Sequence, residues 1–387
     1  MTRKWRNAAI VILILIAWDA ASLYAQALFE QTEVFAGGQD DINTYRIPSL
    51  ICTKNGTLLA FSEGRKDSSA DGSPTDLVLK RSLGNAGMWT PENALLFHTG
   101  GRSRRNIMMW QPMQTLIHSL HGEAYMNPVP VIDRSDGTIY LLVNDYSQPY
   151  ADLPAEILII KSTDEGATWS SPVNITSSVG RNELGPGVGI QLRSGKLVVP
   201  LYDGVIFSDD HGKNWRAGSK AAGIADEAQV VELADGSLML NRRSRHNRTV
   251  IMSKDDGQTW GEPSLDPVLT DPFCQGSIIR YTRQDEGFSK DRILFSNPGD
   301  PNDRLNLTVR VSYDEGKTWP VAKTINNGTA AYSSMTIFPD GSIGILYESG
   351  DTYDGFAERY GKVIFARFNL EWLTGGEDRL EKATKAN

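Results

Sequence analysis

The chain has 387 residues, of which 40% are hydrophobic and 22% are charged, and its formal net charge at pH 7 is −8. This composition is typical of a soluble globular protein with a large core, and the acidic balance argues against a nucleic-acid-binding surface, which is normally basic. Cys52 and Cys274 are the only cysteines, and we expect two buried thiols rather than a disulfide. No Cys/His pair has zinc-ligand spacing, so we expect neither a metal site nor a cofactor.

The first 25 residues have the pattern of a signal peptide. Three basic residues within the first six are followed by the apolar run Ala8–Ala17 and then by small residues up to Ala25. That run is short for a bilayer span, although an uncleaved anchor is the alternative. We therefore expect a secreted or periplasmic protein without a membrane span after cleavage.

From Gln31 onward, short apolar runs alternate with turns, and no segment has the pattern of a long amphipathic helix. Five turns combine a turn-forming residue with glycine shortly before a predicted strand: Asn55-Gly56, Asp136-Gly137, Ser194-Gly195, Asp235-Gly236 and Asp340-Gly341. A looser sixth case is Glu286-Gly287, with the predicted strand Arg292–Ser296 after it. Their spacing suits four-stranded blades of about 40–50 residues. We predict an all-β, six-bladed β-propeller over residues 26–372, with an early strand near Val34 closing the ring against Lys362–Phe368.

A second motif, Ser-x-Asp-x-Gly-x-x-Trp, recurs four times, at Ser162–Trp169, Ser208–Trp215, Ser253–Trp260 and Ser312–Trp319. A decayed fifth copy lies at Ser82–Trp89. The glycine can adopt the left-handed conformation of a tight turn, and the tryptophan can pack over that turn. Because the motif repeats blade by blade, we assign its aspartates to the fold rather than to catalysis (Asp164, Asp210, Asp255 and Asp314).

Two segments depart from this rhythm. Phe97–Asn127 is expected to be an insertion or a long loop over one face, and residues 373–387 form a polar C-terminal tail with no clear pattern. The sequence contains no Pro/Ser-rich linker, so we expect no appended domain. We also expect a monomer.

Three arginines lie at the ends of predicted strands. Arg46 precedes the first strand, Arg243 follows Ser237–Asn241, and Arg304 precedes Leu305–Val311. Each alone is more commonly a surface ion-pair partner. A propeller, however, brings such ends together around one axis, and converging guanidinium groups would suit a carboxylate ligand.

The segment Tyr45-Arg46-Ile47-Pro48, followed by the four repeats, resembles the exo-α-sialidases (neuraminidases), in particular the bacterial enzymes with a six-bladed propeller. The resemblance extends from about Gln31 to Phe368. The repeats alone occur in other propellers, so the combination carries the specificity. It implies a glycoside hydrolase that removes terminal sialic acid from glycoproteins, glycolipids and oligosaccharides with retention.

The resemblance also implies roles for individual residues. The carboxylate-binding triad would be Arg46, Arg243 (favoured over Arg242 and Arg245) and Arg304 (favoured over Arg310). In Ala60–Arg65, Glu63 would brace Arg46, and Arg65 would border the C4 side of the sugar. Asp71 would be the acid/base, with Asp67 and Asp76 as competitors, and Tyr332 would be the nucleophile with Glu227 as its base.

The chemistry suits this substrate, because sialic acid carries a carboxylate on the attacked carbon, which would repel a carboxylate nucleophile. A neutral tyrosine avoids this repulsion, and sialidases are a known exception to the two-carboxylate scheme. Taken singly, Glu227 could be a solvated loop charge, Tyr332 a strand aromatic, and Glu63 with Arg65 a surface pair. The alternatives are a trans-sialidase or anhydro-forming enzyme, a silent glycan-binding propeller, or a hydrolase of a related nine-carbon acid.

Overall fold

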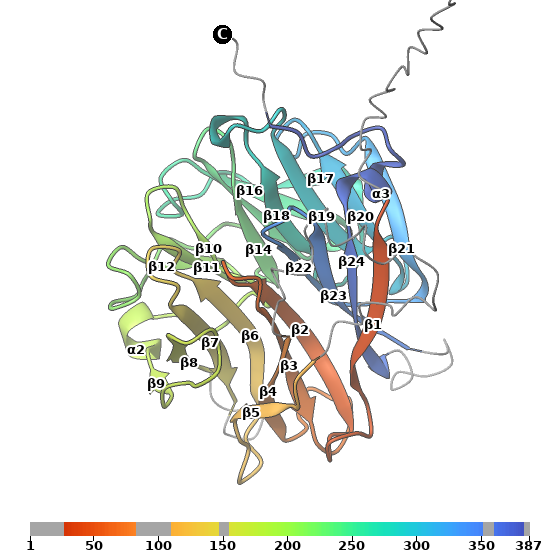
Figure 1. Cartoon of the computed structure of the whole chain (residues 1–387). Helices are drawn as coiled ribbons and strands as arrows, with labels where there is room; N and C mark the ends of the chain where they lie inside the picture. Colours follow the sequence, from red (N-terminus) through yellow and green to blue (C-terminus); the bar gives the residue numbers. More distant parts are fainter. Residues whose placement is uncertain (1–26, 83–109, 147–154, 351–359, 383–387) are drawn as a thin grey trace, which may run out of the picture.

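The computed structural model describes residues 27–82, 110–146, 155–350 and 360–382, and these form six four-stranded antiparallel sheets arranged around one axis (Figure 1). This confirms the predicted six-bladed β-propeller. The predicted signal peptide, the end of the decayed repeat at Ser82–Trp89, and the first part of Phe97–Asn127 lie outside the described residues.

Each blade contains four strands in sequence order, from the inner strand outward, except that β1 is the outermost strand of the last blade. The first three blades are β2 (Thr44–Cys52), β3 (Leu58–Arg65), β4 (Thr75–Ser82), β5 (Gln114–Ile117); β6 (Tyr125–Ile132), β7 (Ile139–Asp145), β8 (Glu156–Ser162), β9 (Val173–Asn174); and β10 (Ile190–Gln191), β11 (Leu197–Leu201), β12 (Gly204–Ser208), β13 (Arg216–Ala217).

The last three blades are β14 (Ala228–Glu232), β15 (Leu238–Arg242), β16 (Arg245–Ser253), β17 (Ser264–Pro272); β18 (Ser277–Thr282), β19 (Arg292–Pro298), β20 (Leu305–Ser312), β21 (Val321–Thr329); and β22 (Ser333–Ile337), β23 (Ile343–Ser349), β24 (Lys362–Phe368), β1 (Phe29–Ala36). The short helices are α2 (Thr176–Val179), the 3₁₀ turn Gln284–Glu286, and α3 (Leu370–Thr374).

The ring closes between the two ends of the chain. Strand β1 pairs antiparallel with β24, from Phe29 opposite Phe368 to Ala36 opposite Lys362. The last blade is therefore built from both termini, as expected from the sequence. Closure encloses β24 between two strands, and β1 forms the outer edge of this blade.

The four Ser-x-Asp-x-Gly-x-x-Trp repeats form the turns between the third and fourth strands of their blades. In the first copy, Asp164 accepts hydrogen bonds from the backbone N–H of Thr168 (2.9 Å) and from the hydroxyl of Ser162 (2.8 Å). The indole N–H of Trp169 donates to the carbonyl of Gly166 (3.2 Å). The aspartate is thus engaged within its own turn, which agrees with the structural role predicted for the repeated aspartates.

The repeats also join neighbouring blades. Gly166 has a φ of +75°, and a Cβ at this position would lie 2.2 Å from Cδ2 of Leu59 in the preceding blade. Gly316 makes the same kind of approach to Met239. Glycine is therefore favoured at this point of the repeat for its left-handed backbone, and a larger residue would also have to displace the end of a side chain in the neighbouring blade.

The prediction that Phe97–Asn127 is an insertion or a long loop is wrong for the described part of this segment, residues 110–127. Gln114–Ile117 is the outermost strand of the first blade, and Tyr125–Asn127 begins the inner strand of the second. Trp110 packs edge-on against Phe365, with ring centroids 5.7 Å apart. The strand β5 is short and pairs irregularly with β4, so its sequence pattern is weak.

The polar segment after residue 372 packs on the propeller as far as Lys382. Asp378 accepts hydrogen bonds from both Nε and Nη2 of the buried Arg292, each at 2.8 Å. The backbone of Lys382 forms a bridge with Phe288. These contacts make residues 373–382 part of the folded body.

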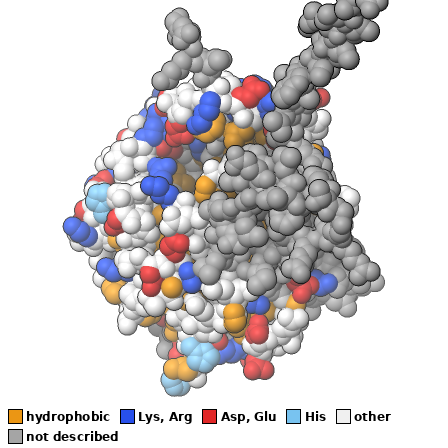
Figure 2. Space-filling model, in the orientation of Figure 1, with side chains coloured by type: hydrophobic (Ala, Val, Ile, Leu, Met, Phe, Trp, Pro, Cys, Tyr) orange, Lys and Arg blue, Asp and Glu red, His pale blue; other side chains and the backbone are white. Residues whose placement is uncertain are grey.

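Both cysteines are free thiols, and Cys274 is buried, whereas Cys52 is only half-buried. Among the described residues, no helix is both long and apolar enough to cross a bilayer. Figure 2 shows acidic and basic side chains interspersed over the described part of one face, with a few hydrophobic side chains between them.

Candidate active site

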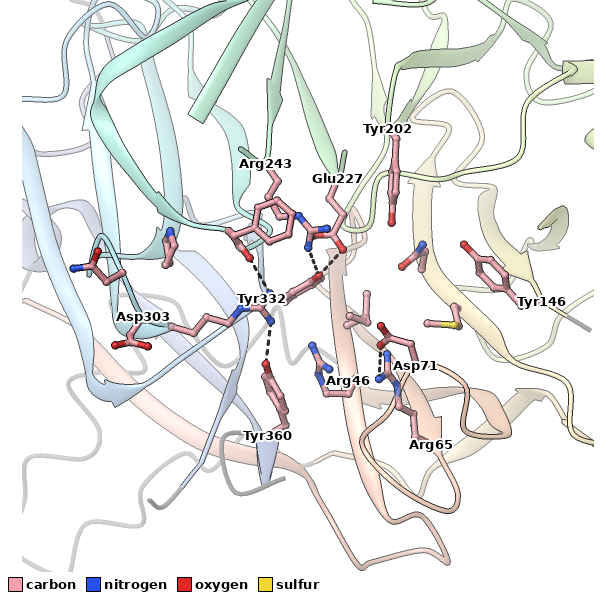
Figure 3. Close-up of a pocket in the computed structure, with 17 residues that line it drawn as sticks. Arg46, Arg65, Asp71, Tyr146, Tyr202, Glu227, Arg243, Asp303, Tyr332 and Tyr360 are labelled. Atoms are coloured by element: carbon pink, nitrogen blue, oxygen red, sulfur yellow. Dashed lines mark hydrogen bonds and ion pairs between the residues drawn. The ribbon is translucent and has the colours of Figure 1, made fainter. Parts of the chain in front are cut away.

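A cavity of about 480 Å³ opens where several blades meet, and its lining contains most of the residues predicted from the sequence (Figure 3). The residues labelled there include Arg46, Arg65, Asp71, Glu227, Arg243, Tyr332, Tyr360, Tyr202, Tyr146 and Asp303, and Arg304 lines the cavity as well. Antiparallel order explains this gathering, because inner strands start, and second strands end, at the same face of the propeller.

Tyr332 and Glu227 form the centre of the cavity. They lie directly before the inner strands β22 and β14, and the Tyr332 hydroxyl donates a hydrogen bond to Oε1 of Glu227. Each residue is 5% exposed. The pairing predicted from the sequence is therefore present, although 105 residues separate the two along the chain.

Arg243 holds this pair from the neighbouring strand end. Its Nη1 donates to the Tyr332 hydroxyl (2.9 Å) and lies 2.7 Å from Oε2 of Glu227, as an ion pair that is not aligned as a hydrogen bond. Asp226 accepts from Nε of the same arginine (2.7 Å) and lies 2.6 Å from its Nη2. Four charged or ionisable groups thus form one contiguous network.

Burial raises the pKa of Glu227 to about 7, and the nearby charge of Arg243 offsets this only in part. Burial also raises the pKa of Tyr332 well above 10, and the negative charge of Glu227 adds to the effect. Near neutral pH, Glu227 is therefore poised to exchange a proton, while Tyr332 keeps its own until a base takes it.

Arg46 and Arg304 reach the cavity from the other side of Tyr332. Arg46 is 3% exposed, and its Nε donates to Oε1 of Glu348 (2.7 Å). Arg304 donates to the hydroxyl of Tyr360 (2.9 Å) and to the carbonyl of Phe273 (2.8 Å). With Arg243, they surround the tyrosine with three guanidinium groups.

The competing arginines point elsewhere. Arg242 donates to the carbonyl of Ala222, and Arg310 donates to the side chain of Asn297. Arg245 lies over the ring of Phe273 and does not line the cavity. Of the alternatives left open by the sequence, the structure brings only the favoured arginines into the cavity.

The expectation that Glu63 braces Arg46 is wrong. Glu63 is completely buried and lies beneath Arg65, whose Nε and Nη2 donate to its Oε2 at 3.0 and 2.6 Å. Glu63 does not line the cavity, and Glu348 braces Arg46 instead. The cause is a bulge after Arg46, where Ile47 has a φ of +53° and donates its N–H to the same Glu348 oxygen (2.8 Å).

Asp71 is the carboxylate at the cavity rim. It is held by Nη1 of Arg65 (2.7 Å), and its side chain is 62% exposed. Asp67 is exposed outside the cavity, whereas Asp76 is buried and accepts from the backbone of Ser119 (2.7 Å). Only Asp71 of the three candidates therefore lines the cavity.

Sequence reasoning missed Glu348, Asp226, Tyr360 and the tyrosines 146 and 202. Glu348 had a usable signal, because an acidic residue near the end of the apolar strand Ile343–Ser349 must be paired if it is buried. Tyr360 and the others carry no local pattern. Within the described parts of the chain, no group of three or more His, Cys, Asp or Glu side chains is arranged to hold a metal ion.

Comparison with known proteins gives a consistent result. Residues 56–345 match the family described as the BNR repeat-like domain. The chain is 31% identical to a sialidase of Micromonospora viridifaciens over 90% of this chain and 55% of that protein. It is 30% identical to an exo-alpha-sialidase of Aspergillus fumigatus over 86% of each chain.

A solved structure shows the same architecture. The Hadza microbial sialidase Hz136 superposes with a TM-score of 0.73 and 28% identity, covering 89% of this chain and 69% of that one. This chain thus spans about half the length of the Micromonospora relative and most of the length of the Aspergillus relative. On its repeats, its propeller and these relatives, the chain belongs to the sialidase family of glycoside hydrolases.

Proposed function

We propose that this protein is a retaining exo-α-sialidase that removes terminal sialic acid from glycoconjugates, with Tyr332 as the nucleophile. The observation that carries the proposal is the hydrogen-bonded Tyr332–Glu227 pair surrounded by Arg46, Arg243 and Arg304 in one cavity. Three guanidinium groups beside a neutral nucleophile suit a substrate that carries a carboxylate on the attacked carbon.

In the first step, the Tyr332 oxygen bonds to the anomeric carbon while Glu227 takes the phenolic proton. The bond from that carbon to the glycosidic oxygen breaks, and Asp71 delivers a proton to the leaving oxygen. In the second step, Asp71 takes a proton from water, whose oxygen displaces Tyr332. Glu227 returns the proton to the phenolate, and two inversions give net retention.

The position of Asp71 suits this double role. It lies at the rim with its side chain 62% exposed, so both the leaving group and water can reach it. We also propose that the protein is exported, which its N-terminal sequence favours.

The test is release of the fluorophore from a 4-methylumbelliferyl α-sialoside. Tyr332→Phe should lose most of the activity. Asp71→Ala should retain more activity on this substrate than on a natural sialoside, because an aryl leaving group needs little protonation. Asp67→Ala is the matched control from the same loop and should behave as wild type.

Two outcomes would contradict the proposal. Folded wild-type protein without turnover between about pH 4 and 8 would reject hydrolase activity, and a glycan array would then test a binding function. NMR would identify the released product. An anhydro sugar in place of free α-sialic acid would reassign the reaction to intramolecular transfer.

A further inference from the structure

We infer that Tyr360 is a positioning residue that holds Arg46 and Arg304 at the spacing needed to bind the substrate carboxylate. The inference rests on the proposed function and adds to it a residue outside the predicted catalytic set. Tyr360 lies just before strand β24, in the blade that closes the ring, and Figure 3 shows it near Arg46.

Tyr360 contacts the two arginines in different ways. The guanidinium carbon of Arg46 lies 3.7 Å from the centre of its ring, in a cation–π stack. The hydroxyl accepts a hydrogen bond from Nη1 of Arg304 at 2.9 Å. One rigid side chain therefore sets the position of an arginine from the first blade and of another from the fifth.

Arg304 depends on this contact more than the other arginines do. Arg46, Arg65 and Arg243 each form an ion pair with a carboxylate, whereas no described carboxylate lies within ion-pair distance of Arg304. Its hydrogen bonds go to two neutral oxygens, those of Tyr360 and of the Phe273 backbone. The tyrosine hydroxyl thus orients Arg304 without neutralising its charge, which stays available for an anionic ligand.

Tyr360 lines the cavity, but its burial leaves little of its surface for direct contact with the substrate. Only 1% of the residue is exposed, and it packs in a cluster with Ile47, Cys274, Ala331 and Tyr332. It therefore acts through the arginines, whereas Tyr332 meets the reacting carbon.

The experiment compares two variants with wild type. Tyr360→Phe keeps the ring over Arg46 but removes the acceptor for Arg304, and Tyr360→Leu removes both contacts. The matched control is Tyr281→Phe, which removes the hydroxyl that donates to the carbonyl of Gly341 (2.7 Å) and lies outside this cavity.

The readout is binding of a 2,3-didehydro analogue of sialic acid and of its methyl ester, together with KM and kcat on the aryl sialoside. Tyr360→Phe should bind the acid about tenfold more weakly, equivalent to one weakened polar contact, and should raise KM more than it lowers kcat. Binding of the ester, which lacks the carboxylate charge, should not change. Tyr360→Leu should lose more acid affinity than Tyr360→Phe.

A general structural role would weaken acid and ester equally, or would change only the Tm, as we expect for Tyr281→Phe. The inference is overturned if Tyr360→Phe shows either of these results, or if its affinity for both ligands is unchanged. In those cases, turnover by the wild-type protein would still leave the proposed function intact. Wild-type protein that neither hydrolyses the sialoside nor binds the acid overturns both.

Discussion

Replacement of Glu227 by glutamine should stabilise the protein while removing most of its activity. The burial that raises the pKa of this carboxyl to about 7 also makes its ionised form unfavourable in the folded state. Glutamine keeps the shape and can still accept the hydrogen bond from Tyr332. Arg243 keeps its contacts with Asp226. Turnover should fall because an amide cannot take the phenolic proton.

The magnitude follows from the difference between the folded pKa and the ordinary value of 4.5. That difference, at about 1.4 kcal/mol per pKa unit, corresponds to about 3 kcal/mol of stability lost by wild type at pH 8. A group with a raised folded-state pKa contributes fully to stability below its unfolded pKa and loses this contribution as pH rises through the folded one. The advantage of Glu227→Gln should therefore be near zero at pH 4 and should grow between pH 4.5 and 7.

The assay is chemical denaturation of both proteins from pH 4 to 8. Glu315→Gln is a control of opposite sign: burial raises the pKa of Glu315, but hydrogen bonds from Arg280 and from the Ala234 backbone outweigh this and lower it. That variant should be less stable than wild type at neutral pH, and the difference should shrink as pH falls. A Glu227→Gln variant that is equally stable at every pH, or that is destabilised at pH 8, would refute the reasoning.

Three further predictions concern stability. Glu348→Ala leaves the buried Arg46 without its carboxylate, so the free energy of unfolding should fall by about 3–5 kcal/mol and kcat/KM should drop, as denaturation and kinetics can measure. Asp378→Ala should lower the Tm, since it removes the carboxylate that pairs with a buried arginine; an unchanged Tm would mean that the C-terminal segment does not stabilise the propeller. Gly166→Ala should destabilise more than Gly180→Ala in thermal denaturation, because both glycines have positive φ but only the former would bring a Cβ against a neighbouring blade.

The propeller could be predicted from the sequence because its hairpin turns depend on glycines that can be recognised from a few neighbouring residues. The glycines of the hairpins between inner and second strands have positive φ in all six blades, from Gly56 at +85° to Gly341 at +81°. The need for a positive φ at each hairpin therefore appears in the sequence as a glycine in every blade. Strand β5 has no such sequence pattern, since it is a short outer strand with irregular pairing. This explains the wrong expectation for Phe97–Asn127.

The site could be predicted only in part. Strand order alone allowed Arg46, Arg243 and Arg304 to converge, and the family resemblance was needed to choose them over their neighbours. The ion-pair partners of these arginines were harder to predict, because they depend on the directions in which the side chains point. Glu63 lies opposite Arg46 in the β-ladder, yet the bulge after Arg46 turns that arginine toward Glu348 in another blade.

The charge arrangement bears on how an acidic protein would bind the anionic substrate that we propose. Arg46, Arg65 and Arg243 each have a carboxylate partner, so their charges are largely compensated in the unliganded protein. Arg304 has neutral acceptors only among the described residues. Arg304 is therefore the one of these four arginines with no direct ion-pair partner among the described residues, although the carboxylates around the cavity are at least as numerous as the arginines. The net charge of −8 affects the approach of a ligand over distances beyond about 10 Å only weakly at physiological salt, so local compensation governs what the cavity accepts.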